Sequence, residues 1–119
     1  MTRAALDEAL AALADPTRRA VVDLLRKRPH RAGELAETLA VTPPALSRHL
    51  RQLRRSGLVA ADEHEHDARV RLYRLRPEGF AALQRWVDAI GGLWQDQLAA
   101  FSAHAEGRAA RGGTRRNTA

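Results

Sequence analysis

The sequence contains no cysteine, so disulfides and metal sites built from thiolates are excluded. It has no apolar run long enough to cross a membrane and no signal-peptide pattern at its start, and we therefore expect a cytoplasmic protein without a membrane partner. A Ser/His/Asp set, a glycine-rich phosphate loop and a metal-hydrolase motif are also missing. We accordingly expect neither an enzyme nor a bound cofactor.

Lysine is nearly absent too. Lys27 is the single lysine among 20 basic residues, and the net charge is +6. The planar guanidinium group of arginine can donate two hydrogen bonds at once to phosphate or guanine. A composition rich in arginine and alanine is, however, also typical of a GC-rich genome. Both explanations of the composition stay open at this point.

The length of 119 residues suits one domain with a modest core. We predict that this domain covers residues 1–106. Residues 107–119 are rich in glycine, arginine and threonine, and we expect them to form a basic, disordered tail.

Residues 32–59 carry the clearest pattern, which predicts two helices joined by a tight turn. Thr42 can cap the second helix, and Pro43 takes the first helical position, where its missing N–H costs nothing. Gly57 suits the left-handed conformation that ends a helix. The second helix has an apolar side, Leu46, Leu50 and Leu53, and a polar, basic side, Ser47, Arg48, Arg51, Arg54 and Arg55. Such a helix can pack on a core while presenting cations to the major groove of DNA.

Two helices precede this pair and a hairpin follows it. The first helix is short and is marked by leucines at helical spacing, Leu6, Leu10 and Leu13. Asp15-Pro16, a cap followed by proline, marks the start of the second helix. Residues 57–75 contain two strand-like stretches around a charged centre, which predicts a hairpin with its tip near His66, Asp67 and Ala68.

The last predicted helix, Glu78 to His104, carries a wide apolar stripe that includes both tryptophans. A small domain cannot cover so much apolar surface with its own core, so we predict an interface along this helix. Trp86 and Trp94 form either a dimer core or the lining of a pocket for an organic effector. The predicted interface also includes Leu83, Val87, Ile90, Leu98 and Phe101.

Five short motifs stand in a distinctive order: Leu13-Ala-Asp-Pro-Thr-Arg-Arg19, Glu34-Leu-Ala36, Ser47-Arg-His-Leu-Arg-Gln-Leu53, Gly57-Leu-Val59 and Arg71-Leu-Tyr-Arg-Leu75. With the order of the elements, they make the chain resemble bacterial winged helix-turn-helix repressors of the ArsR/SmtB family. The resemblance covers roughly residues 5–100. It implies a mainly α fold with a small β-hairpin, in the order α-α-α-α-β-β-α.

The resemblance also implies partners and contact residues. It implies a homodimer joined through the first and last helices, which adds Leu6 and Leu10 to the predicted interface. The fourth helix is expected to enter the major groove of double-stranded DNA, while the hairpin, a wing carrying Arg69, touches the flanking backbone or minor groove. The DNA-facing segment of the family falls on Thr42, Pro43, Pro44, Ser47, Arg48 and His49, to which the basic side of the helix adds Arg51.

Several of these positions have a second interpretation. Pro43 and Pro44 offer only apolar contact, which shifts base recognition toward Ser47 and Arg48. His49 either makes a hydrogen bond within the domain or contacts phosphate. Arg54 and Arg55 either contact DNA or interact with the end of the helix dipole.

The metal sites of the family are not matched. The positions of thiolate ligands hold Ala36 and Thr38, and those of the last-helix ligands hold Ile90 and Leu98. We therefore expect no metal site and an effector that is not a transition metal. Residues 63–67, Glu-His-Glu-His-Asp, form either a polar hairpin tip, which we favour, or a weak zinc site.

The sequence thus predicts a sequence-specific DNA-binding regulator, a homodimeric repressor that binds an inverted-repeat operator. Two other functions stay open. One is a sensor defined by small-molecule binding at the last-helix interface, and the other is a protein-interaction module that kept the fold and reads no DNA.

Overall fold

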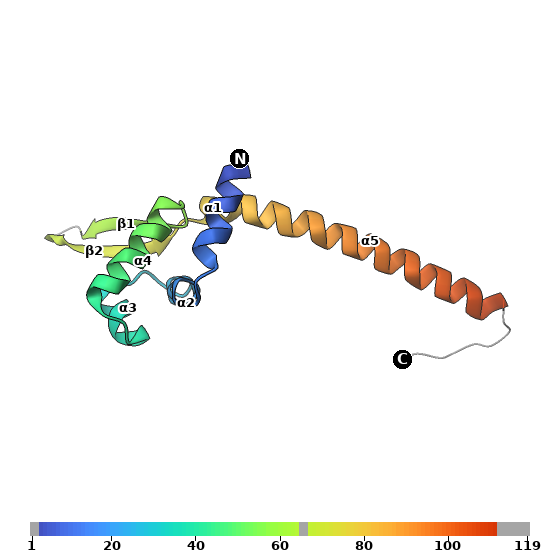
Figure 1. Ribbon diagram of the computed structural model, residues 1–119, viewed down its shortest axis with the longest axis horizontal. Coiled ribbons are helices and arrows are strands. Elements are labelled where there is room, and N and C mark those ends of the chain that lie inside the picture. The colour runs from blue at the N-terminus through green and yellow to red at the C-terminus, as the bar shows by residue number, and fades with distance from the viewer. Residues whose placement is uncertain (1–2, 65–66, 112–119) are drawn as a thin grey trace. The chain divides into compact units, whose positions relative to one another are not determined.

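The computed structural model describes residues 3–64 and 67–111 (Figure 1). The helices are α1 (Arg3–Leu13), α2 (Pro16–Leu25), α3 (Ala32–Leu39), α4 (Pro43–Arg55) and α5 (Ala81–Arg111), and a short 3-10 helix, η1 (Pro77–Phe80), precedes α5. The strands β1 (Val59–His64) and β2 (Asp67–Leu75) pair in antiparallel fashion. The chain divides into two units, residues 1–84 and 85–119.

The predicted order of helices and strands is confirmed, but two of the three residues predicted at the hairpin tip belong to a strand. The strands pair regularly from Val59 with Leu75 to Glu63 with Arg71, and after a register shift His64 pairs with Asp67. Residues 67 and 68, predicted at the tip, therefore belong to β2. The third predicted tip residue, His66, lies outside the described residues. Without a glycine to mark the turn, the sequence could not fix its position.

The last helix is also longer than predicted. It follows η1, whose start at Pro77 suits a residue with a fixed φ and no N–H, and it continues to Arg111. Residues 107–111, which were assigned to the disordered tail, are helical, because their alanines and arginines favour a helix more than the single Gly107 disfavours it. The rest of the predicted tail, residues 112–119, lies outside the described residues.

The predicted helix caps are confirmed. The Oδ1 atom of Asp15 accepts hydrogen bonds from the N–H groups of Thr17 (2.8 Å) and Arg18 (3.1 Å) at the start of α2. At the start of α4, the Oγ1 atom of Thr42 accepts from the N–H of Ala45 (3.3 Å). These bonds satisfy backbone donors that have no partner within the helix.

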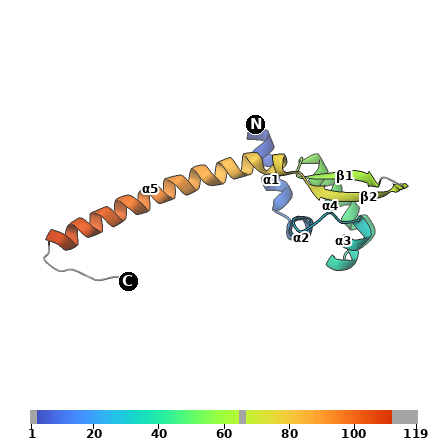
Figure 2. The ribbon, with the colours of Figure 1, turned by 180° about the vertical axis from the view of Figure 1, so that it is seen from behind.

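The core of the first unit is formed by α1 to α4 and the base of the hairpin. The views from both sides show α4 running beside the hairpin, and α4 contacts β1 (Figures 1 and 2). The largest fully buried side chains are Val21, Leu35, Leu46, Leu53, Leu58 and Val59. Burial of a leucine or valine side chain contributes about 1.5–3 kcal/mol, so α4, with two of these leucines, is firmly held.

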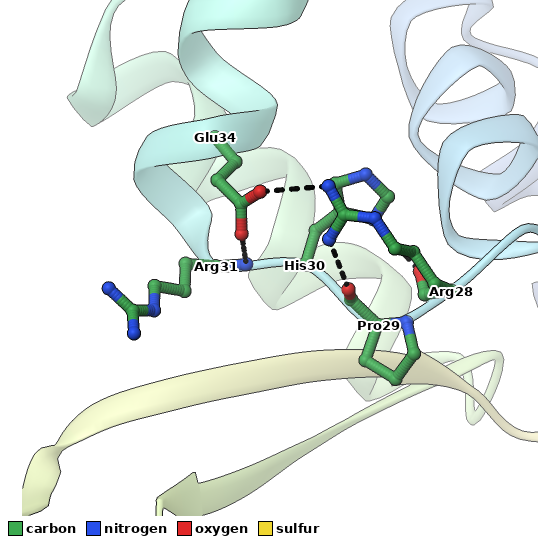
Figure 3. A network of polar contacts seen from close by, with 5 residues as sticks. All are labelled: Arg28, Pro29, His30, Arg31 and Glu34. Atoms are coloured by element: carbon green, nitrogen blue, oxygen red, sulfur yellow. Dashed lines mark hydrogen bonds and ion pairs between the residues drawn. The ribbon is translucent and has the colours of Figure 1, made fainter.

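The loop between α2 and α3 is fixed by polar contacts (Figure 3). His30 is buried, and its Nδ1 donates to the backbone oxygen of Arg28 (2.8 Å) because a carbonyl can only accept. Its backbone pairs with Tyr73 of β2 through two hydrogen bonds (3.1 and 2.8 Å). Glu34 accepts from the N–H of Arg31 and the side chain of Arg28 (both 3.0 Å), which holds the pKa of Glu34 below its ordinary value. The loop thus joins the start of α3 to β2.

Gly79 of η1 lies directly against the backbone of Gly57. A Cβ atom on Gly79 would lie 2.7 Å from the carbonyl carbon of Gly57 and 3.2 Å from the Cα of Leu58. Gly57 itself has a φ of 80°, the left-handed conformation predicted for the end of α4. Because the atoms that would clash are backbone atoms, no side-chain rotation can relieve them.

Gly79→Ala is therefore expected to destabilise the fold by about 1–3 kcal/mol. The matched control is Gly33→Ala in α3, where an added Cβ meets nothing within 4 Å. That change should leave stability unchanged or raise it by up to about 1 kcal/mol, because alanine favours a helix over glycine. Thermal unfolding followed by circular dichroism compares the two. Equal melting temperatures would contradict the close approach of η1 to Gly57.

Candidate DNA interface

The α4 helix has one buried and one exposed side, as predicted. Its leucine row, Leu46, Leu50 and Leu53, is at most 2 % exposed. On the other side Ser47, Arg48 and Arg51 are exposed together with Arg54 and Arg55. Residues three and four apart share a face of a helix, so the leucine row fixes the outward direction of the predicted DNA-contacting residues.

The turn between α3 and α4 is built on a left-handed residue that is not glycine. Ala40 has φ 54° and ψ 44°. The N–H groups of Ala40 and Val41 donate to the backbone oxygens of Glu37 (3.3 Å) and Ala36 (3.1 Å), which closes α3. Nothing in the sequence signals this position, because the left-handed conformation costs alanine about 1–2 kcal/mol.

In the first turn of α4, residues 43–46, no backbone N–H group is free. Pro43 and Pro44 lack one, the N–H of Ala45 donates to the Thr42 side chain (3.3 Å), and the N–H of Leu46 donates to the Thr42 carbonyl (2.9 Å). Helix N-termini often bind phosphate through such groups. Within this turn any DNA contact has to come from side chains, and those of Pro43 and Pro44 are exposed, as is that of the capping residue Thr42.

A groove of about 740 Å³ lies between the C-terminal half of α4 and the base of the hairpin. We call it the basic groove. It is lined by Arg51, Arg54 and Arg55 of α4, by Val59, Ala60 and Ala61 of β1, and by Arg74, Arg76 and Glu78. Arg74 and Arg76 were not predicted, although the two-residue period of a strand would have placed them on one side.

Two of the five arginines in the basic groove form ion pairs. The Nε of Arg74 lies 2.7 Å from Asp62, and the Nε of Arg76 lies 3.0 Å from Glu78. The backbone N–H of Glu78, and next the side chain of Arg76, lower the pKa of the Glu78 carboxyl. For Arg51, Arg54 and Arg55 of α4, no acidic partner is found in the described part of the chain. The groove therefore carries an excess of positive charge and suits an anion.

His49 lies on α4 beside the basic face and is half-buried. Its Nδ1 lies 3.4 Å from the Nη1 of Arg18 in α2. Arg18 also donates from its Nε to the backbone oxygen of Ala12 (2.6 Å) and from its Nη2 to that of Ala11 (3.3 Å), both in α1. The hydrogen bond within the domain, one of the two alternatives for His49, is thus present, and the contact with phosphate stays a prediction. Sequence reasoning did not identify Arg18 as its partner.

Other predicted positions are placed only in part. Arg69 lies in β2 and His64 ends β1, but their side chains are outside the described part of the structure, as is all of His66. Among the residues that are described, no group of three or more potential ligands could hold a metal ion. The possible zinc site at residues 63–67 therefore stays untested.

The predicted dimer interface is exposed along α5. The large apolar side chains there are between 45 % and 72 % exposed, and they are Trp86, Val87, Leu93, Trp94, Leu98 and Phe101. Leu83 and Ile90 are half-buried. In α1, Leu10 is exposed and Leu6 half-buried. Dimerisation through these residues stays a prediction.

Comparison with known proteins defines the class. Residues 15–61 match the family model described as bacterial regulatory protein, arsR family. The HTH-type transcriptional regulator Rv2034 of Mycobacterium tuberculosis is 44% identical over 94 residues, which are 75% of this chain and 85% of that protein. The HTH-type transcriptional repressor SmtB of M. tuberculosis is 35% identical over 94 residues, which are 79% of this chain and 66% of that protein.

Solved structures agree. The crystal structure of an ArsR-family transcriptional regulator, 32% identical, has a TM-score of 0.69 and covers 80% of this chain and 95% of its own. An ArsR-like transcriptional regulator from Rhodococcus sp. RHA1, 31% identical, has a TM-score of 0.68 and covers 90% of this chain and 98% of its own. The fold is a winged helix-turn-helix DNA-binding fold. The chain belongs to the ArsR family of transcriptional regulators. In the part of the chain that is described, no helix is both long and apolar enough to span a membrane.

Asp15, which starts α2 three residues before Arg18, should make stability depend on acid. The backbone N–H of Arg18, and then that of Thr17, lower the pKa of Asp15 below its ordinary value of 3.8. The fold therefore favours the carboxylate, so its contribution is present above that ordinary pKa and is lost as pH falls through the lowered one. Asp15→Asn keeps a capping oxygen but cannot titrate. Its melting temperature should fall less between pH 6 and pH 3 than that of the wild type.

Thermal unfolding at several pH values tests this expectation. Asp7→Asn removes the same charge from the exposed side of α1 and serves as the control. If the two variants depended on pH in the same way, the stabilisation of the Asp15 carboxylate would be refuted.

Proposed function

We propose that this protein is a homodimeric transcriptional repressor that binds an inverted-repeat operator in double-stranded DNA. The observation that carries the proposal is the exposed side of α4, where Ser47, Arg48 and Arg51 face away from the core. Membership of the ArsR family supports it, as does the name of the relative SmtB, a transcriptional repressor.

In this proposal, the N-terminal half of α4 reads base edges in the major groove. Arg48 can donate two hydrogen bonds to the O6 and N7 atoms of guanine, and Ser47 can donate or accept. Pro43 and Pro44 can contact only apolar groups, such as the methyl of thymine. Base recognition therefore rests on few side chains, because the backbone of residues 43–46, the first turn of α4, has no free donor.

The C-terminal half of α4 and the hairpin bind the DNA backbone. The basic groove places Arg51, Arg54 and Arg55 beside Arg74 and Arg76, and planar guanidinium groups bind phosphate in a bidentate manner. Arg69, nearer the start of β2, is the residue of the wing that we expect to contact the flanking DNA. Phosphate contacts of this kind position the protein and do not discriminate between sequences.

The dimer forms mainly through the apolar stripe of α5, together with Leu6 and Leu10 of α1. Exposed apolar side chains as numerous as Trp86, Val87, Trp94, Leu98 and Phe101 are typical of an interface. A two-fold dimer presents two α4 helices, which is the symmetry of an inverted repeat.

The DNA contacts are tested with two arginine variants. Footprinting should show an inverted repeat upstream of the gene, with half-site centres about 10 to 10.5 base pairs, or a multiple of that, apart. Arg48→Ala should weaken binding to this operator by about 1–3 kcal/mol and affect random DNA much less. Arg55→Ala removes the same charge from the basic groove. It should weaken binding to both DNAs equally and make the salt dependence shallower.

The control is Arg28→Ala, because Arg28 is exposed and already pairs with Glu34 (3.0 Å). It should leave affinity for operator DNA unchanged, as measured by fluorescence anisotropy at several salt concentrations. Equal losses for Arg48→Ala on both DNAs would assign Arg48 to phosphate. If the wild type bound neither its upstream DNA nor random DNA, the proposal would fail in favour of a protein-interaction module.

The dimer is tested by placing a charge on the stripe. Trp94→Asp should yield monomers with poor operator affinity, since an unpaired charge is costly to bury. Ala99→Asp places the same charge about 140° further round α5 and should remain dimeric. Sedimentation velocity compares the variants at micromolar concentration. A wild-type protein that sediments as a monomer there would refute the proposed assembly.

A further inference from the structure

Arg18 connects three helices through a single side chain. Its Nε donates to the backbone oxygen of Ala12 (2.6 Å) and its Nη2 to that of Ala11 (3.3 Å), and its Nη1 lies 3.4 Å from the Nδ1 of His49. The two carbonyls belong to the last turn of α1, where backbone oxygens have no partner within the helix. The third contact reaches α4, 31 residues along the chain.

The contact with Arg18 determines which nitrogen of His49 carries the proton. A guanidinium group can only donate, so Nδ1 must accept, and in a neutral imidazole the hydrogen is then on Nε2. No hydrogen-bond partner of Nε2 is found among the described residues. Within that part of the chain, no buried side-chain nitrogen or oxygen lacks a partner, so Nε2 keeps access to solvent. His49 thus has one nitrogen occupied and one N–H available.

We propose that Arg18 is a positioning residue that holds His49 with its Nε2–H available as a donor to a phosphate oxygen of bound DNA. The proposal rests on the proposed function, because it requires α4 to lie against DNA. An imidazole ring that is already held in one tautomer and one orientation loses little conformational entropy when it binds DNA. A ring that is not held has to adopt the right tautomer and the right orientation on binding, which costs more. Arg18 itself is held by Asp15, whose carboxylate accepts from the backbone N–H of Arg18 (3.1 Å).

The neighbouring Arg19 provides a matched control. It also binds the end of α1, since its Nη1 donates to the backbone oxygens of Leu13 (2.8 Å) and Ala14 (3.1 Å). Unlike Arg18, it forms no hydrogen bond or ion pair with α4 among the described residues. Loss of either arginine removes two hydrogen bonds to the end of α1 or the turn that follows it, but only loss of Arg18 releases His49.

The first experiment compares Arg18→Gln with Arg19→Gln in the full chain. Both should lower the melting temperature by similar amounts, because both remove bonds to α1. Only Arg18→Gln should also weaken binding to the footprinted operator, by about three- to tenfold. Equal operator affinities for the two variants would show that Arg18 acts on stability alone and would overturn the proposal.

Two variants of His49 separate its two nitrogens. His49→Asn retains an acceptor near the position of Nδ1 and lacks the outer donor, so it should weaken operator binding at least as much as Arg18→Gln does. His49→Gln places an amide donor near the position of Nε2 and should bind the operator more tightly than His49→Asn. Arg18→Gln should add no further loss to His49→Asn, because Arg18 acts on DNA binding only through the donor that His49→Asn already removes. Additive losses, or a weaker Gln variant than Asn variant, would count against the proposal.

The nitrogen resonances of His49 give a readout that does not depend on DNA. In the wild type they should show the tautomer protonated at Nε2, and in Arg18→Gln a mixture of the two. A wild-type ring protonated at Nδ1 would overturn the inference even if the protein binds its operator. A protein that binds no DNA at all would refute the proposed function, and the donor role of His49 with it.

Discussion

The burial of Leu46, Leu50 and Leu53 attaches α4 to the core, and the rest of the candidate DNA interface depends on this contact. Each of these side chains contributes about 1.5–3 kcal/mol by leaving water. The exposed ion pairs of the basic groove contribute far less, because water and salt screen them. Turning α4 about its axis would expose the leucines and bury arginines without partners, which is very costly. The helix therefore has one stable orientation, and the arginines on its other side acquire a fixed direction from apolar packing.

Local signals explain why so much of the fold was predictable. Asp15-Pro16 and Thr42-Pro43 mark helix starts through short hydrogen bonds and a fixed φ, and both are found as predicted. Gly57 ends α4 in the left-handed conformation that its lack of a side chain permits. The spacing of the leucines in α4 predicted which side of this helix is buried, because a helix repeats every 3.6 residues. Each of these signals lies within a few residues of the feature that it specifies.

The features that were missed depend on residues far apart in the sequence or on conformations that carry a cost. The contact between Arg18 and His49 joins positions 31 residues apart, and arginines are too common in this chain to single one out. The basic groove required the hairpin to fold back beside α4 before Arg74 and Arg76 could join it. Ala40 adopts a left-handed conformation that its own side chain disfavours. The length of α5 was underestimated because residues 107–119 were assigned to a disordered tail on their overall content of glycine, arginine and threonine, although the helix continues to Arg111.

The pairing of His30 with Tyr73 also affects how the hairpin behaves toward other chains. A two-stranded sheet has two open edges, and unpaired backbone groups along an edge can template the addition of a strand from another molecule. Both backbone groups of Tyr73 are already bonded to His30, and the neighbouring Arg71 and Arg74 present exposed side chains that carry charge. Covered edges and charged edge residues are two means by which natural sheets resist aggregation. At Tyr73, the edge of β2 therefore has no free backbone group to which a strand of another molecule could bind. The wing can be exposed there without promoting self-association.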